Sequence, residues 1–448
     1  MTTQQEAMAA MLDWFRSSGG YVHPSVEFVN DPITGLSAFS TAEISPDERL
    51  ISCPFELVIT AELATKSICK ISGLEEKDLM RTSSSGRESW SEAMRIAAYL
   101  CLHWVRRDNM HPALVHKDYV QSLPRSADLL TPLYFNDAEL SLLQNTNLIH
   151  AVRETRQIWE EDCETVRKVL KEEGITWDRF RTAMTYLSSR AFPSKLIRLP
   201  EDGKATSSTA VQVSEEEESH PVLIPGLDLL NHTRAQPILW LSSLVPGPSG
   251  DPIPSISLVS TRSQAAKTQL YNNYGPKPND QLLLAYGFVI DDNPDDTVAL
   301  RLGSTFPPNI MARYEKKNLD PTKRFILKRD GLVDPALLDI VRTSLEEDEE
   351  EIDEEDVHGQ MEKEQKDMQL ELDVLGFVGQ KLEDEYFRLQ AEIKPVEGEI
   401  REEVRRMCEV YRKGQSDILG RAMDLLEERT ANIEELMDQG MGGCHCCS

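Results

Sequence analysis

Residues 224–232 read Ile-Pro-Gly-Leu-Asp-Leu-Leu-Asn-His, and residues 271–288 read Tyr-Asn-Asn-Tyr-Gly-Pro-Lys-Pro-Asn-Asp-Gln-Leu-Leu-Leu-Ala-Tyr-Gly-Phe. Taken alone, the Asn231-His232 pair suits the end of a strand or helix with satisfied side chains. Tyr274 and Tyr286 taken alone suit half-buried structural tyrosines. The two segments together, in this order and about 40 residues apart, form a more specific pattern than either one.

Short strand-like segments flank these motifs and also occur near the N-terminus. Between residues 26 and 60, apolar runs such as Leu50-Ile-Ser-Cys alternate with proline and glycine, which predicts short strands. Residues 238–241 and 255–260 lie on either side of a Pro-Gly-rich turn cluster at 246–252. This arrangement predicts a hairpin with a long loop.

Helical periodicity dominates the first residues and the stretch from 61 to about 190. A helix is predicted over residues 4–18, and another over 148–173 with Gly174 as its end. The Ser89-x-x-Glu92 pattern is a capping box, and it predicts a further helix behind it. Strand segments therefore bracket a helical insertion of more than 100 residues, and no internal repeat is present.

Two segments have a biased composition. Residues 201–219 are rich in Ser, Thr and Glu, so we expect a low-complexity insertion that loops out without packing. Residues 346–356 contain ten carboxylates in eleven positions, with Ile352 as the exception. Such a like-charge run predicts a solvated acidic loop that steers basic partners toward the protein. After residue 300 the periodicity is helical again.

The bulk composition excludes several classes of protein. The 448 residues carry a formal net charge of −28, which argues against non-specific nucleic-acid binding through a basic face. No apolar run approaches the roughly 20 residues of a membrane span, and the N-terminus lacks a secretory signal pattern. We therefore expect an intracellular protein, in the nucleus, the cytoplasm or both, that acts as a monomer on a basic protein partner.

The cysteines indicate neither a disulfide framework nor a metal site. Five of the eight are scattered singly, as expected of reduced, buried thiols, and the other three lie in the C-terminal Cys444-His-Cys-Cys. That tail is too crowded to close one tetrahedral zinc site, so we expect a disordered tail and no metal. The histidines form no HExxH pattern, and the chain has no Gly-rich turn of the Rossmann kind. Metal hydrolases and Rossmann-like methyltransferases are therefore unsupported.

The two opening segments together resemble the signature of the SET-domain protein methyltransferases. In that family an Asn-His pair and a later Tyr-Gly meet through a knot-like crossing of the chain. Their flanks look specifically like the Rubisco large-subunit methyltransferase-like branch, whose members carry a helical insertion and a helical substrate-binding domain. The resemblance extends over nearly the whole chain and is strongest at residues 30–60 and 186–290.

The resemblance implies an α+β fold of short β-sheets with a knot-like crossing, a helical insertion and an all-helical C-terminal domain. The implied divisions are residues 1–64 for the first part of the SET domain with its N-terminal helix, 65–190 for the insertion, 191–300 for the rest of the SET domain, and 301–448 for the substrate-binding domain.

The resemblance also implies S-adenosyl-L-methionine as the cofactor and assigns residues to it. Ser189-Arg190-Ala191-Phe192 is similar to a family element whose arginine meets the cofactor carboxylate, a task suited to a planar guanidinium. Pro32-Ile33-Thr34-Gly35 stands where the family has a Gly-rich cofactor loop, with one glycine missing. The remaining implied cofactor contacts are Asp228, Asn231, His232, Tyr286 and Phe288.

On the substrate side, the resemblance implies that Tyr274 is the catalytic tyrosine and that Phe192, Asp228, Trp240 and Tyr274 contact the substrate. The implied activity is protein-lysine N-methylation of a non-histone protein, with ribosomal proteins as typical targets of fungal relatives. A histidine-methylating member has Asn at the position of Phe192, so the aromatic residue favours lysine. Two alternatives stay open: a protein-histidine methyltransferase, and an inactive SET scaffold that binds a basic protein.

Overall fold

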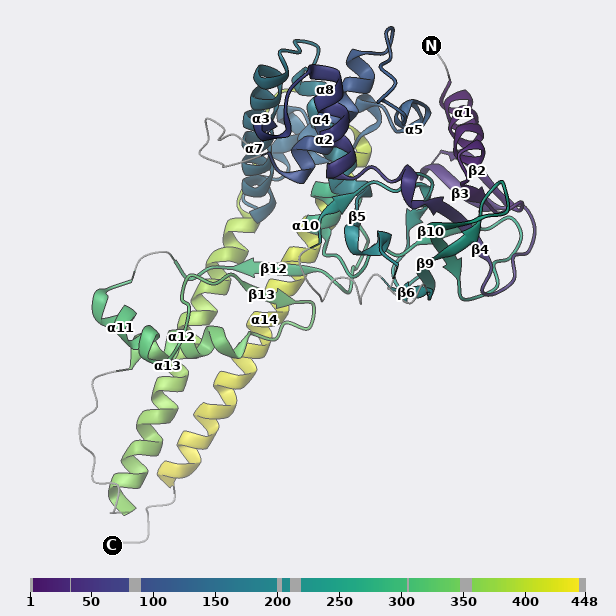
Figure 1. The fold of residues 1–448 in the computed structure, drawn as a ribbon. Helices are drawn as coiled ribbons and strands as arrows, with labels where there is room; N and C mark the ends of the chain where they lie inside the picture. The colour runs from purple at the N-terminus through teal and green to yellow at the C-terminus, as the bar shows by residue number, and fades with distance from the viewer. Residues whose placement is uncertain are drawn as a thin grey trace, which may run out of the picture. The chain divides into compact units, whose positions relative to one another are not determined.

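The structure is a computed structural model, and it describes residues 3–32, 34–79, 90–199, 204–209, 219–303, 306–346 and 357–442. The chain forms two compact units (Figure 1). The first comprises residues 1–129 and 153–276, and the second comprises residues 130–152 and 277–448. Each unit therefore contains segments that are distant in the sequence.

The first unit is built around a five-stranded sheet in the order β1-β4-β10-β9-β6. Its bounds are β1 Tyr21–Val22, β4 Arg49–Pro54, β6 Thr206–Ser208, β9 Ile238–Pro246 and β10 Pro252–Ser260. The β9–β10 pair is the hairpin predicted from the turn cluster, and its register runs from Pro252 opposite Pro246 to Ser260 opposite Ile238. Ile51, Cys53, Ile256 and Leu258 are fully buried on this sheet. An N-terminal strand and a strand 200 residues later thus share one core.

A second sheet, in the order β2-β3-β11-β8, brings the two signature segments together. Its strands are β2 Val26–Asp31, β3 Gly35–Ser40, β8 Asn231–His232 and β11 Gln269–Asn272. β11 pairs antiparallel with β3 and parallel with β8. A small pair, β5 Phe192–Pro193 with β7 Pro221–Val222, completes the strands of this unit within the described residues.

The helices of the first unit lie at the N-terminus and in the predicted insertion (Figure 1). They are α1 Gln4–Ser17, α2 Ala61–Ser72, α3 Glu76–Leu79, α4 Glu92–Val105, α5 Lys117–Ser122, most of α7 Asn147–Leu170, and α8 Trp177–Arg190. The side chains of Thr3 and Thr60 accept hydrogen bonds that cap α1 and α2. The insertion between the strand segments is helical, as predicted.

Two local predictions were wrong. α4 is capped by Ser91, whose hydroxyl accepts from the Met94 amide, and not by Ser89, which lies outside the described residues. Part of the 201–219 segment also packs, because β6 (Thr206–Ser208) adds to β9 as an edge strand. The paired groups are backbone amides and carbonyls, so a polar sequence does not prevent strand addition.

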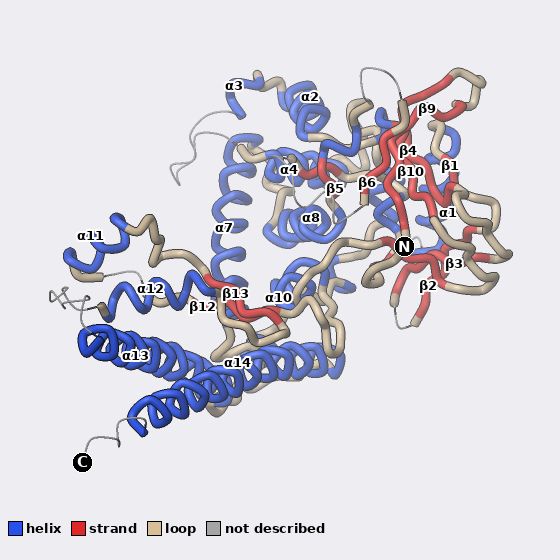
Figure 2. Tube along the Cα trace, turned by 90° about the horizontal axis from the view of Figure 1, so that it is seen from below, coloured by secondary structure: helices blue, strands red, loops and turns tan. Residues whose placement is uncertain are grey.

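The second unit combines a short segment of the insertion with the C-terminal third of the chain. Its elements are the 3₁₀ turn Pro132–Tyr134, α6 Asp137–Ser141, the first turns of α7, α10 Asn279–Gln281, the π-helical turn Leu282–Tyr286, β12 Thr297–Leu300, α11 Pro308–Lys316, β13 Phe325–Lys328, α12 Pro335–Leu345, α13 Val357–Gln390 and α14 Glu402–Gly442. α13 and α14 lie side by side in both views (Figures 1 and 2).

An apolar cluster holds the helices of the second unit together. Val374, Leu382, Ile418 and Ala422 are fully buried between α13 and α14, and α12 and the β12–β13 pair pack against the same cluster. The C-terminal region is helical as predicted, except for strand β13, which periodicity did not reveal. The remainder of the acidic run after Glu346 and the Cys444-His-Cys-Cys tail lie outside the described residues.

A membrane span would need a long, uninterrupted apolar helix, and the described part of the chain contains none.

Candidate functional site

The parallel pairing of β8 with β11 determines which side chains of the signature segments meet. Tyr271 lies opposite Asn231, and Asn272 lies opposite His232. The Thr233 amide continues the contact by donating to the Asn272 carbonyl at 3.0 Å. Asn231, His232 and Tyr274, which the sequence places about 40 residues apart, are therefore neighbours in the fold.

His232 and Tyr274 form a stacked pair. Their ring centroids lie 4.9 Å apart with an interplanar angle of 21°. The Tyr274 amide donates to His232 Nδ1 at 3.0 Å, so Nδ1 is the acceptor and the ring hydrogen lies on Nε2. The Tyr274 hydroxyl donates to the Leu230 carbonyl at 2.8 Å. Both ends of Tyr274 are thus held by the 230–232 segment.

Asn231 ties the same crossing to the loop between β2 and β3. Its Nδ2 donates to Ser37 Oγ at 2.8 Å and to the Thr34 carbonyl at 3.3 Å. The Asp31 carboxylate accepts from the Thr34 amide and hydroxyl at 2.8 and 3.0 Å. Gly35 has φ +68°, a left-handed conformation that glycine adopts without strain.

The glycine that this loop lacks corresponds to Ile33. Pro32 lies in the turn with Thr34, and Ile33 lies outside the described residues. The Asp31 side chain holds Thr34 through its amide and its hydroxyl. Thr34 is close to Asn231, and the role of Pro32 and Thr34 in cofactor binding stays a prediction.

Arg190, Asp228 and Tyr119 form a buried polar cluster. Arg190, the last residue of α8, uses Nη1 to donate to the Asp228 carbonyl at 2.8 Å and to Asp228 Oδ2 at 3.3 Å. The Tyr119 hydroxyl donates to the same Oδ2 at 2.8 Å. The Asp228 side chain is completely buried, whereas that of Arg190 is 20% exposed. Arg190 therefore presents part of its guanidinium to solvent while Asp228 holds the rest.

The electrostatics of this cluster follow from burial. Burial raises the pKa of Asp228, an effect that the Arg190 guanidinium and the Tyr119 hydroxyl oppose. Asp228 Oδ1 is buried without a hydrogen-bond partner among the described residues. Such an atom is costly unless a ligand or water satisfies it.

Phe192 and Trp240 form a second aromatic contact in the first unit. Their ring centroids lie 5.4 Å apart in an edge-to-face arrangement, and both side chains are buried. Trp240 Nε1 donates to Asn272 Oδ1 at 3.0 Å, which links the pair to β11. The predicted substrate residues Phe192 and Trp240 are thus in contact with each other and joined to the crossing.

Tyr286 and Phe288 belong to the second unit. Their rings contact each other edge to face at 6.1 Å, and Lys277 Nζ lies 5.9 Å from the centre of the Tyr286 ring. Burial raises the pKa of Tyr286 to about 12. Their assignment to the cofactor stays a prediction.

Sequence reasoning missed three members of the site. Tyr119 comes from the insertion and meets Asp228 109 positions later. Ser37 and Asn272 receive the hydrogen bonds of Asn231 and Trp240. No local pattern marks Tyr119, whereas Asn272 adjoins a quoted motif and alternation along β11 could have identified it as inward-facing. Among the described residues, no group of three or more His, Cys, Asp or Glu side chains could hold a metal ion.

The chain is similar in sequence to several curated proteins. No protein-family model matches the chain. It is 32% identical to ribosomal lysine N-methyltransferase set10 of Schizosaccharomyces pombe over 304 residues, which cover 66% of this chain and 48% of that protein. It is 24% identical to actin-histidine N-methyltransferase of Mus musculus over 304 residues, covering 65% of this chain and 44% of that protein. The chain spans about half the length of the curated relatives it matches.

The fold has a close match among solved structures. The structure of Rubisco LSMT bound to AdoMet superimposes with a TM-score of 0.68 and 18% identity, covering 100% of this chain and 98% of the other. The chain therefore has the SET-domain fold. This is the fold of the Rubisco LSMT structures, as the resemblance drawn from residues 224–232 and 271–288 predicts.

Proposed function

We propose that this protein is an S-adenosylmethionine-dependent protein-lysine N-methyltransferase that acts on a non-histone protein, with basic ribosomal proteins as the substrate class. The observation that carries the proposal is the assembly of Arg190, Asn231, His232 and Tyr274 by the crossing of β8 and β11. The names of the relatives support it, since set10 is a ribosomal lysine N-methyltransferase.

The residues at the crossing fit the cofactor. Arg190 uses only Nη1 in its hydrogen bonds among the described residues, so further guanidinium donors remain for a carboxylate. Asn231 holds the Thr34 carbonyl next to β8, and Pro32 and Thr34 would contact the cofactor together with His232. Asp228 is completely buried behind Arg190, which favours a positioning role for its carboxylate over direct contact with cofactor or substrate. Tyr286 and Phe288 would supply aromatic walls.

The chemistry needs alignment more than acid–base groups. S-adenosylmethionine supplies an electrophilic methyl group on a sulfonium, and transfer to an amine is an in-line displacement. The Tyr274 hydroxyl gives its hydrogen to the Leu230 carbonyl, so its oxygen acts as an acceptor that orients the amine N–H. Burial of the substrate amine beside a cation lowers its pKa, which favours the neutral nucleophile.

Phe192 supports lysine as the acceptor. Its ring is buried against Trp240, and such a pair suits the alkyl chain of lysine. Histidine methylation is the second candidate, because one relative is an actin-histidine N-methyltransferase. Acid hydrolysis of protein labelled with radioactive S-adenosylmethionine separates the two: methyllysine supports the proposal, and methylhistidine supports the alternative. Absence of both cofactor binding and label would indicate an inactive scaffold.

We assign substrate recognition to residues 301–448, as the sequence predicts. Phe387 on α13 is 67% exposed, and the exposed carboxylates Glu383 and Asp384 precede it without ionic partners in the described chain. An aromatic side chain among unpaired carboxylates suits a basic protein surface. The net acidity of the chain favours the same partner and disfavours nucleic acid. We further propose a monomer located in the nucleus, the cytoplasm or both.

Truncation after residue 300 does not test this assignment, because it would also disrupt the rest of the second unit. Arg401 pairs with the buried Glu139 at 2.7 Å, and Arg412 donates to the Gln144 carbonyl at 2.7 Å, so removing α14 exposes the 130–152 segment of the same unit. The exposed variant Phe387→Ser avoids this damage. We expect it to raise the KM for the protein substrate roughly 10-fold and to leave cofactor affinity unchanged. Leu332→Ser, at a 64% exposed residue of the same unit, is the matched control. An unchanged KM for Phe387→Ser would contradict the assignment.

A further inference from the structure

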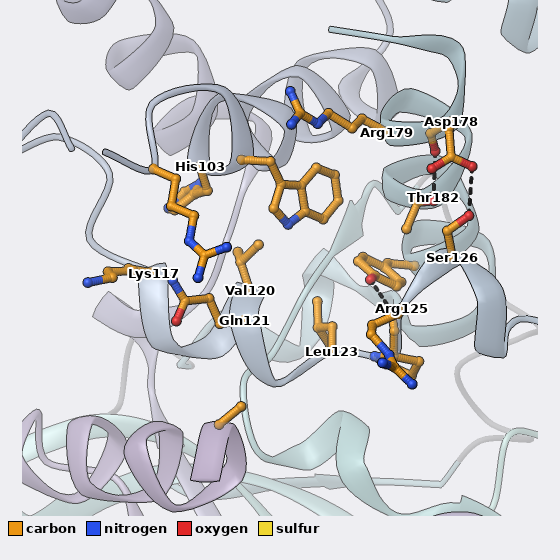
Figure 3. Close-up of a pocket in the computed structure, with 15 residues that line it drawn as sticks. His103, Lys117, Val120, Gln121, Leu123, Arg125, Ser126, Asp178, Arg179 and Thr182 are labelled. Carbon is orange, nitrogen blue, oxygen red and sulfur yellow. Dashed lines mark hydrogen bonds between the residues drawn. The ribbon is translucent and has the colours of Figure 1, made fainter. Parts of the chain in front are cut away.

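A cavity of about 440 Å³ lies among the helices of the first unit (Figure 3). It is bounded by α1, α4, α5, α8 and the loop 123–126. None of the residues proposed above for methyl transfer lines it. Its volume lies within the range of roughly 300–1,000 Å³ typical of small-molecule sites.

His103 is a buried histidine whose residue contributes to the cavity lining. Its side chain belongs to a residue only 3% exposed, and its Nδ1 bonds the Tyr99 carbonyl at 2.9 Å. Because a carbonyl only accepts, Nδ1 carries the hydrogen and Nε2 presents a lone pair. Nε2 has no hydrogen-bond partner among the described residues. Burial lowers the pKa of His103 to about 4, so the ring is neutral near pH 7.

The cavity is basic although the chain is acidic. Four basic side chains line it, Arg107, Lys117, Arg125 and Arg179, with Asp178 as the one carboxylate among the lining residues. That carboxylate already accepts from Ser126 Oγ at 2.7 Å and pairs with Arg181 at 2.8 Å. In a chain of net charge −28, this concentration of positive charge indicates an anionic ligand.

The basic side chains are not equally available. Arg125 pairs with Asp128 at 3.0 Å, and Arg179 donates to the Gly174 carbonyl at 2.7 Å. Arg107 and Lys117 have no ionic partner in the described part of the chain. Figure 3 shows Lys117 and Gln121 on the same side of the cavity as His103, opposite Arg125 and Asp178. The positive charge without an ionic partner therefore lies at the His103 end of the cavity.

Apolar and aromatic side chains form the rest of the lining. The rings of Trp104 and Tyr186 contact each other edge to face at 6.1 Å, and Val120 and Leu123 also line the cavity. The Tyr186 hydroxyl donates to the Pro124 carbonyl, which fixes that ring. A rigid aromatic wall favours a flat ring in the ligand.

We propose that this cavity is a second ligand site, separate from the cofactor site, that binds a nucleotide-sized anion with a flat ring, of the nucleoside monophosphate class. Lys117 and Arg107 bind the phosphate, and Trp104 contacts the ring. The site does not depend on the methyltransferase proposal, because its residues and its ligand are different.

Calorimetric titration of uridine 5′-monophosphate into the full chain tests the site, with and without saturating S-adenosylhomocysteine. We expect the nucleotide to bind with the same affinity in both titrations. Uridine, which lacks the anion, and inorganic phosphate, which lacks the ring, should each bind at least about 10-fold more weakly. Absence of nucleotide binding at millimolar concentration would overturn the proposal. Displacement of the nucleotide by S-adenosylhomocysteine would also overturn it, since it would locate the nucleotide in the cofactor site.

Variants identify the cavity as the place of binding. Lys117→Gln and Arg107→Gln alter exposed side chains, so they should fold normally and weaken nucleotide binding roughly 10- to 100-fold, the usual effect of losing a hydrogen bond to a charged group. Lys70→Gln, an exposed lysine of α2, is the control and should change nothing. Equal affinity in Lys117→Gln and Lys70→Gln would contradict the assignment.

Discussion

The crossing of β8 and β11 in the first unit and the α13–α14 pair in the second unit are held by different kinds of contact. In the crossing, single polar atoms fix the geometry, as where Tyr274 is held by the Leu230 carbonyl and His232 Nδ1. In the helix pair, apolar side chains such as Val374, Leu382 and Ile418 share one buried cluster. Removal of one polar atom from the crossing should therefore lower the turnover rate. Shortening a buried side chain of the helix pair should lower only the free energy of unfolding.

The largest effect is expected for Asp228→Ala, because Asp228 serves both folding and the site. The substitution leaves the largely buried Arg190 without its partner and the Tyr119 hydroxyl without its acceptor. Breaking a buried ion pair from one side costs about 3–5 kcal/mol of unfolding free energy. Denaturant unfolding measures this loss. Asp118→Ala, on the same helix as Tyr119, is the control, and an equal loss in both variants would contradict the buried cluster.

Tyr274→Phe should separate chemistry from folding. The substitution keeps the ring stacked on His232 and removes the hydroxyl that bonds the Leu230 carbonyl. Loss of a hydrogen bond that matters mainly in the transition state costs about 2.7–4 kcal/mol, or roughly 100- to 1000-fold in turnover. Cofactor affinity should persist. Tyr271→Phe, whose hydroxyl bonds Gln269, is the matched control. Wild-type turnover in Tyr274→Phe would show that the catalytic assignment is wrong.

The smallest effect is expected for Ile418→Val on α14. Ile418 is fully buried, so loss of one methyl group should lower the unfolding free energy by about 0.5–1.5 kcal/mol. Cofactor affinity should not change, because the residue belongs to the apolar cluster of the second unit. Leu436→Val, at a 59% exposed residue, should leave stability unaltered. A change in cofactor affinity for Ile418→Val would show that the two kinds of contact are not independent.

The sequence predicted the parts of the site that lie in motifs. Arg190, Asn231 and Tyr274 were identified because each lies in a recognisable pattern, and the hairpin over 238–260 followed from its turn cluster. Tyr119 was not predictable, because its contact with Asp228 depends on how the insertion packs and leaves no local periodicity. Strand β6 was not predicted for a different reason. It pairs with β9 through backbone amides and carbonyls, and these groups do not depend on the amino-acid composition of the segment.

The same distinction applies to the basic cavity. Lys117 and Arg107 are ordinary surface residues in the sequence, and His103 lies on an apolar helix face where a satisfied core histidine is the usual expectation. Only the packing of α4, α5 and α8 brings them to one lining. A site built by tertiary packing of unrelated helices has no sequence motif, in contrast to one built by two motifs at a strand crossing.

The central claim is that the crossing assembles a cofactor site through Asn231. Calorimetric titration of S-adenosylhomocysteine into the wild type and Asn231→Ala tests it most directly. Asn231 Nδ2 bonds both Ser37 and Thr34, so its loss removes both hydrogen bonds to β8. The account predicts one binding site in the wild type and affinity roughly 10-fold weaker in Asn231→Ala, with turnover at saturating cofactor much less affected. Absence of binding by the wild type, or equal affinity in both proteins, would contradict it.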